Sequence, residues 1–296
     1  YAEAHIGLAS AFCQAPVYTA MPGTDAWPRV RAHAARALRI DPRLGEAHTF
    51  FAHATLCSEY DWHAAEQGYR RALELDSISW VSRQLYALYF LTCVGRASEA
   101  MSILERARDQ MPDIPGISAF CGMSCMMSRQ FERALTEMEH VLGTDPGFVQ
   151  AYWIRGSSQE ALGDFDGAIA SFEQGAALTR DSALFIAQLA RACAKRGDRD
   201  RAIRLLEGLA ARGEEGGPGA YFRVEALAAL GETECAMDAL HGAHRQRNPF
   251  MVFVGVNFGL DRLRDTRPFR DLMVRVGLPS RAPAQRMRAA PGFVRA

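Results

Sequence analysis

Long apolar runs are absent from this sequence, and its opening residues lack the pattern of a secretory signal peptide. An excess of charge of either sign is also absent, because 34 lysine and arginine residues balance 34 aspartate and glutamate residues. Proteins that bind nucleic-acid phosphates usually carry a basic surface. We therefore expect a chain that neither enters a membrane nor binds nucleic acid directly.

Cysteine is present, but its pattern does not indicate disulfides. The seven cysteines are odd in number, and their spacing follows helices rather than a disulfide framework. We interpret them as reduced thiols of a cytoplasmic protein. Cys121 and Cys125 lie one helical turn apart among Met123, Met126 and Met127. A soft-metal or redox site is therefore an alternative to simple packing at this place.

The sequence also lacks the motifs of catalysis. The glycine-rich stretch 213–219 is not followed by the Lys-Ser/Thr of a phosphate loop, and we interpret it as a joint between helices. His241 and His244 lie one turn apart without a carboxylate in register to complete a zinc site. We therefore predict that this chain is not an enzyme and needs neither a metal nor a cofactor.

A spacing of 34 residues runs through most of the chain. Alanines occur at this interval at Ala100, Ala134, Ala168, Ala202 and Ala236. Glycines precede four of them at Gly95, Gly163, Gly197 and Gly231, and large apolar residues follow them at Leu104, Met138, Phe172, Leu206 and Leu240. Glycine allows a reversal between two helices, alanine allows two helices to approach closely, and the large residue fills the remaining space. Such a period predicts stacked helical hairpins.

These residues resemble the tetratricopeptide repeat (TPR) family. The clearest copy runs through 151–156 and 161–165 to Ala168 and Phe172, and an earlier copy around Ala65 sits one residue off the spacing. The resemblance implies an all-α, right-handed superhelical solenoid of about seven TPR hairpins.

We divide the chain into three parts. Residues 1–248 are expected to form the TPR solenoid, with an irregular first hairpin interrupted by a proline-rich loop at 15–28. The period fails after this part, and we expect residues 249–279 to form a helical cap over the apolar end of the stack. Residues 280–296, rich in proline, alanine and arginine, are read as a disordered tail.

In the TPR family the first helix of each hairpin lines a concave groove. Carried over, this implies a partner-binding groove made by His53, Leu85, Tyr89, Met123, Met126, Trp153, Ser157, Glu160, Arg191, Lys195 and Tyr221. Its methionine and aromatic residues suit an adaptable surface for a peptide or a helix. Arg191 and Lys195 stand on one helix without asparagines, so the groove departs from the carboxylate clamp of chaperone-binding repeats. The alternative is that a neighbouring helix or the chain's own tail covers these residues.

The end of the repeats, with 60–62 and 86–89, is similar to the C-terminal TPR region of bacterial multidomain regulators. In those proteins the repeats follow a winged-helix, Ser/Thr kinase or nucleotide cyclase domain. The resemblance implies a protein-interaction module that serves as a sensory or scaffold arm. Because the chain opens at Tyr1 inside an expected helix, we expect the effector domain upstream. The alternative is a structural or oligomerisation arm without an external ligand, whose partner would be another copy.

Overall fold

The computed structural model describes residues 1–112, 114–212 and 217–278. The expected tail at 280–296 and most of the expected joint at 213–219 lie outside these residues. Within them, the chain forms seven helical hairpins: α1 (Ala2–Tyr18) with α2 (Gly23–Ile40), α3 (Gly45–Glu59) with α4 (Trp62–Leu75), α5 (Trp80–Gln84) and the π-helix η1 (Leu85–Leu91) with α6 (Ala97–Gln110), α7 (Pro115–Met127) with α8 (Phe131–Thr144), α9 (Val149–Ala161) with α10 (Phe165–Leu178), α11 (Ala183–Arg196) with α12 (Arg199–Ala211), and α13 (Gly217–Leu230) with α14 (Thr233–Arg245). The 3-10 helices η2 (Pro249–Phe253) and η3 (Phe258–Leu263) and the helix α15 (Arg267–Arg275) follow.

The prediction of a right-handed superhelical solenoid of TPR hairpins is confirmed. The alanines of the 34-residue spacing are all fully buried: Ala100, Ala134, Ala168, Ala202 and Ala236. The glycines of the turns all have positive φ: Gly95, Gly163, Gly197 and Gly231. Arg129 stands at the matching place of its hairpin and adopts the same left-handed conformation, with φ of 63°. The turn therefore keeps its shape even where the glycine is missing.

The π-helix η1 explains why the earlier repeat sits one residue off the spacing. Within η1 the hydrogen bonds span five residues, and the amide of Thr92 at its end donates to the carbonyl of Ala87 at 3.0 Å. A π-helical turn accommodates one additional residue without breaking the helix, and such turns are frequent at functional sites. The insertion thus lies in the first helix of the third hairpin.

The expected loop at 15–28 is wrong, because α1 continues to Tyr18 and α2 begins at Gly23. Pro16 lies in the last turns of α1, and Pro28 lies in the second turn of α2. A proline inside a helix costs about 3 kcal/mol. Burial of large apolar side chains such as Trp27 and Val30 offsets that cost, at roughly 1.5–3 kcal/mol for each.

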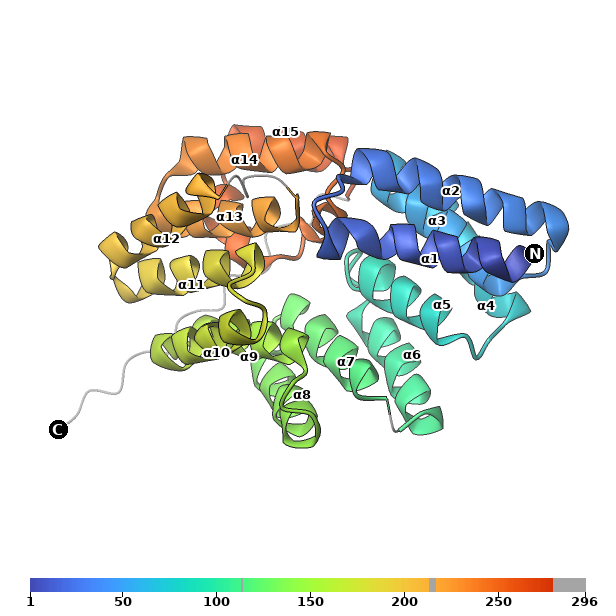
Figure 1. Cartoon of the computed structure of the whole chain (residues 1–296), viewed down its shortest axis with the longest axis horizontal. Helices are drawn as coiled ribbons and strands as arrows, with labels where there is room; N and C mark the ends of the chain where they lie inside the picture. Colours follow the sequence, from blue (N-terminus) through green and yellow to red (C-terminus); the bar gives the residue numbers. More distant parts are fainter. Residues whose placement is uncertain (113, 213–216, 279–296) are drawn as a thin grey trace.

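The two ends of the solenoid meet and close it into a ring (Figure 1). The indole Nε1 of Trp27 donates to the carbonyl of Arg247 at 2.8 Å, and that of Trp62 donates to the carbonyl of Val276 at 2.7 Å. The guanidinium of Arg247 lies 4.8 Å from the ring centroid of Tyr60. We call these contacts the ring closure. They hold the first two hairpins against the end of the last hairpin and the residues after α15.

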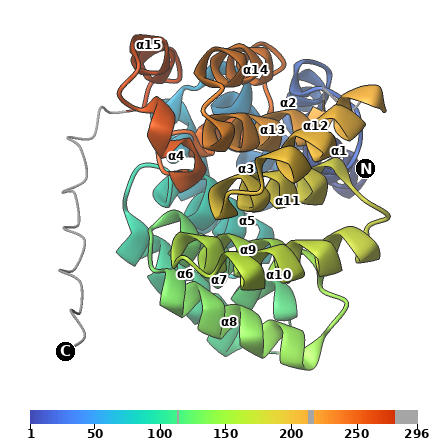
Figure 2. The same ribbon diagram turned by 90° about the vertical axis from the view of Figure 1, so that its left-hand side faces the viewer.

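The expectation that residues 249–279 cap the end of the stack is wrong for their first half. Residues 249–263, which we call the internal segment, lie inside the ring, and Met251, Phe253 and Leu260 are fully buried there. Only α15 packs outside, beside α14 (Figure 2). The internal segment is strongly apolar. It packs against the aromatic and methionine side chains on the first helices of the hairpins, because this contact removes apolar surface from water. Within the described residues, no helix is both long and apolar enough to cross a bilayer.

Candidate functional site

The eleven side chains of the expected groove all lie on the first helices of their hairpins and face the interior. Tyr89 and Lys195 are partly exposed, and the others are buried. Apart from Met126, they lie in two environments. One group forms a buried network that contacts the internal segment, and the other lines an open cavity. Tyr89 and Trp153 belong to both, because their rings lie 5.1 Å from Phe253 and 6.3 Å from Phe250.

A buried charge network, which we call the Arg191 network, occupies the first environment. Arg191 is only 2% exposed, and its Nε donates to Glu160 Oε2 at 2.8 Å while Nη1 pairs with Glu225. Lys195 Nζ lies 2.8 Å from Glu160 Oε1. Burial alone would lower the pKa of Arg191, but the two carboxylates outweigh it and raise that pKa. The charges of these four side chains balance, as buried charges require.

The internal segment is bound to this network. Asn257 Nδ2 donates to Glu225 Oε1 at 2.7 Å and to the hydroxyl of Tyr221 at 3.1 Å. The guanidinium of Arg191 lies 5.5 Å from the ring centroid of Phe258. Ser157 Oγ accepts a hydrogen bond from Arg191 Nη2 at 3.3 Å. Residues expected to contact a partner, namely Ser157, Glu160, Arg191, Lys195 and Tyr221, therefore contact each other or the chain itself.

The internal segment is too apolar to be exchanged easily for a partner. Its large side chains at Phe250, Met251, Val252, Phe253, Val254, Leu260 and Leu263 are all buried. Exposing each would cost roughly 1.5–3 kcal/mol, so that releasing all seven would cost on the order of 10–20 kcal/mol. A micromolar to nanomolar partner supplies about 8–12 kcal/mol. This part of the concave face is core.

The second environment is a cavity of about 1020 Å³ in the middle of the ring, which we call the interior cavity. Its walls come from α1, α2, α3, α5, η1, α7, α9, α11, α13 and the start of η2. The buried side chains of its floor are Cys13, Trp27, Phe50, His53, Leu85, Ala119, Met123, Trp153, Ile154, Phe185 and Phe250. Of the expected groove, His53, Leu85, Tyr89, Met123 and Trp153 thus border open space. Met126 is buried in the core and does not line the cavity.

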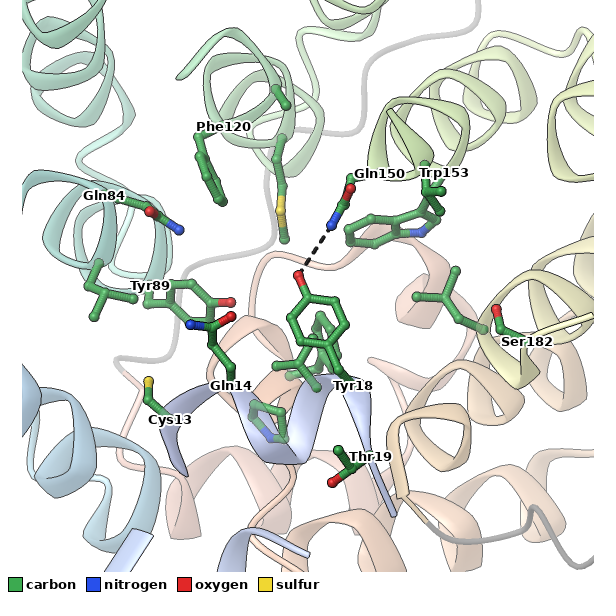
Figure 3. A pocket seen from close by; sticks show the side chains of 18 of the residues that line it. Cys13, Gln14, Tyr18, Thr19, Gln84, Tyr89, Phe120, Gln150, Trp153 and Ser182 are labelled. Carbon is green, nitrogen blue, oxygen red and sulfur yellow. Dashed lines mark hydrogen bonds between the residues drawn. The ribbon is translucent and has the colours of Figure 1, made fainter. Parts of the chain in front are cut away.

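Uncharged polar side chains surround the opening of the interior cavity. We call these side chains, together with the apolar Phe120 that lies among them, the rim: Gln14, Tyr18, Gln84, Phe120, Gln150 and Ser182. Gln150 Nε2 donates to the hydroxyl of Tyr18 at 3.2 Å, which joins α9 to the end of α1 (Figure 3). Gln14 and Tyr18 were not among the expected groove residues, because a loop was expected from residue 15 and no groove residue was assigned to the first hairpin.

The floor offers neutral groups rather than reactive ones. His53 Nδ1 lies 2.8 Å from the hydroxyl of Tyr69, and burial lowers the pKa of His53 to about 3. Burial also raises the pKa of the Cys13 thiol to about 12. A neutral imidazole and a protonated thiol give this surface hydrogen-bonding capacity without charge, and a protonated thiol is a poor nucleophile.

The paired thiols on α7 pack within the core. Cys121 and Cys125 are fully buried, and burial raises their pKa values to about 12 and about 11. Cys125 Sγ donates to Met101 Sδ at 3.8 Å. Among the described residues, no group of three or more His, Cys, Asp or Glu side chains is placed to hold a metal ion.

Comparison with known proteins agrees with this architecture. A family described as "Tetratricopeptide repeat" matches residues 160–215. No curated protein matches the sequence. Human IFIT1, in a dimer with m7Gppp-AAAA, is a similar solved structure with a TM-score of 0.60 at 14% identity, covering 85% of this chain and 68% of that one.

Two further solved structures match this chain over almost their whole length. A TPR protein from Parabacteroides merdae has a TM-score of 0.58 at 13% identity and covers 93% of this chain and 98% of that one. PilW, described as a widely conserved type IV pilus biogenesis factor, has a TM-score of 0.57 at 17% identity and covers 74% and 96%. The fold is that of a TPR solenoid, and the matched segment supports a TPR repeat protein. Proteins of this class are generally non-catalytic scaffolds that bind other proteins.

Proposed function

We propose that this chain is a protein-interaction module that binds a peptide or protein partner at the rim of its interior cavity and at the aromatic side chains next to the rim. It would act in the cytoplasm as the sensory or scaffold arm of a bacterial signalling or transcription regulator. The observation that carries the proposal is that the interior cavity is the part of the concave face which the internal segment leaves uncovered. Its border combines soft aromatic and methionine side chains with amides.

The chemistry of this border suits a polypeptide. Tyr89, Phe120 and Trp153 give apolar surface with little conformational freedom to lose. Gln84 and Gln150 each carry a donor and an acceptor, as a peptide group requires. A partner that used the Arg191 network instead would have to displace the internal segment.

Capture with the purified chain tests the interaction. A photo-crosslinker at Gln84 should trap a specific partner, whereas one at Glu74, exposed on α4, should not. The double substitution Phe120→Arg and Gln150→Arg should weaken capture at least tenfold. Leu162→Arg, exposed at the end of α9, is the matched control. Equal capture by both variants would contradict binding at the rim.

A structural or oligomerisation arm is the second candidate. The exposed fraction of Tyr18 at the rim is 65%, and a second copy could cover it. Self-association in sedimentation measurements, without any captured partner, would favour this candidate. The gene sequence upstream of Tyr1 tests the regulator role, because that role requires an effector domain in the parent protein.

A further inference from the structure

The interior cavity has the size of a small-molecule site. Pockets that enclose most of a drug-sized ligand measure about 300–1,000 Å³, and this cavity is about 1020 Å³. Filled with water alone, such a space would hold on the order of 30 molecules at about 30 Å³ each. Trp27, Phe50 and Met123 face that water with apolar surface. Replacing it by an apolar ligand is therefore favourable.

The lining carries no formal charge. Charged residues make up 23% of the chain, yet none of the described residues that line the interior cavity is Asp, Glu, Lys or Arg. Glu160 and Arg191, on the same helices as part of the lining, are paired within the Arg191 network. A charged ligand would lose its hydration here without gaining a partner, which is costly in an apolar environment. The cavity thus selects against ions.

The rim offers hydrogen bonds to one end of such a ligand. Gln84 and Gln150 point into the hollow from α5 and α9, and Tyr18 reaches toward Gln150 from the end of α1 (Figure 3). An amide can donate and accept, so these groups suit a hydroxyl or carbonyl head group better than an ammonium or a carboxylate. The additional residue in η1 falls in this wall, where Leu85 and Tyr89 border the cavity.

We propose that the interior cavity is a binding site for an uncharged, mainly apolar small molecule, whose hydroxyl or carbonyl group bonds to the amides of the rim. This activity goes beyond the capture of a protein partner. Ligand binding is measured on the chain without a protein partner, so that a negative result for the ligand can be distinguished from a negative result for the proposed interaction.

A series of ligands with one alkyl chain and three head groups tests the proposal. Binding of 1-decanol, decanoate and decylammonium to the full chain is measured by calorimetry below micelle-forming concentrations. Tryptophan fluorescence reports the binding independently, because two of the four tryptophans, Trp27 and Trp153, line the cavity. The expected result is one saturable site for 1-decanol and at least tenfold weaker binding of both ions. Absence of saturable 1-decanol binding, or equal affinity for all three ligands, would overturn the proposal.

A charge added to the wall provides the matched test. Val149→Lys places a cation at the partly exposed start of α9, inside the lining. It should shift the preference toward decanoate by at least tenfold. Leu162→Lys adds the same charge at the exposed other end of α9, outside the lining, and should leave the preference unchanged. An equal shift in both variants, or no shift in Val149→Lys, would place the ligand elsewhere and reject the cavity as its site.

Discussion

Arg191 is a cation held almost entirely out of water, and its partners come from two other hairpins and from the internal segment. Glu160 lies on α9 and Glu225 on α13, while Phe258 of the internal segment covers the guanidinium. A buried charge of this kind fixes the register of neighbouring elements more than it adds stability, because desolvation opposes the Coulomb attraction. The residue was expected to meet a partner because its helix faces inward. Sequence periodicity predicts which face of a helix a side chain occupies, but not which distant segment of the chain packs against that face.

Removal of one partner from the Arg191 network should be strongly destabilising. Arg191→Ala leaves the buried Glu225 without a cation and Glu160 with the partly exposed Lys195 alone, and we expect it to lower the free energy of unfolding by about 3–5 kcal/mol. Lys195→Ala, which removes a partly exposed cation from the same Glu160, should cost clearly less. Urea unfolding of both variants measures the difference. Equal costs would show that the burial of Arg191 has no energetic consequence.

His53 should make the fold sensitive to acid. Its pKa is about 3 in the folded chain, against an ordinary value of 6.5, because burial disfavours the charged ring. Below pH 6.5 the unfolded chain therefore binds a proton that the folded chain does not, and stability falls. The loss is about 1.4 kcal/mol for each pH unit until the folded-state pKa is reached, or roughly 2 kcal/mol at pH 5.

The substitution His53→Gln isolates this contribution, because glutamine can still bond to the hydroxyl of Tyr69. Its free energy of unfolding, measured between pH 7 and pH 5, should fall less steeply than that of the natural chain. His63→Gln, at an exposed position of α4, is the control and should keep the natural slope. A variant at 53 with an unchanged slope would exclude the imidazole as the source.

At the scale of the element, the turns of the hairpins require a residue with positive φ. A glycine-to-alanine substitution should therefore destabilise the chain in a turn and stabilise it inside a helix. Gly197 has φ of 100° with free space around it, so Gly197→Ala is opposed by backbone strain alone. We expect a cost of about 1–2 kcal/mol. Gly208 lies inside α12 with equally free space, and Gly208→Ala should stabilise by about 0.5–1 kcal/mol. Urea midpoints that move in the same direction in both variants would contradict this assignment.

The elements that the sequence predicts well are those specified by neighbours in the chain. The 34-residue spacing records turn chemistry and helix crossing within one repeat, so the hairpins and the inward faces are predictable from it. Arg129 illustrates the limit. It replaces a turn glycine, and the structure gives it a long-range partner, since its Nη2 lies 2.7 Å from Asp261 Oδ1 in η3. The path of the internal segment depends on such distant contacts, which no local period encodes. The interior cavity was missed for the same reason.

At the scale of the whole molecule, the ring closure joins the two ends of the solenoid, and the internal segment packs in the interior of the ring. An open stack of repeats depends only on contacts between neighbours and can lose its end repeats one at a time. Here Trp27 and Trp62, from the first two hairpins, bond to the backbone of Arg247 after the last hairpin and of Val276 after α15. We therefore expect the hairpins to unfold together rather than from the ends.

Truncation distinguishes a core segment from a displaceable one. A chain that ends at residue 247 loses the whole internal segment and the contact of Trp62 with Val276. If the internal segment is core, this chain should lose its cooperative thermal transition, whereas a chain that ends at residue 278 should keep it. The substitution Phe253→Ala is the milder probe and should cost about 3–5 kcal/mol, because Phe253 is fully buried. A shortened chain that stays folded and gains partner binding would instead show that the internal segment occupies the groove as an exchangeable ligand, and would return the Arg191 network to the binding surface.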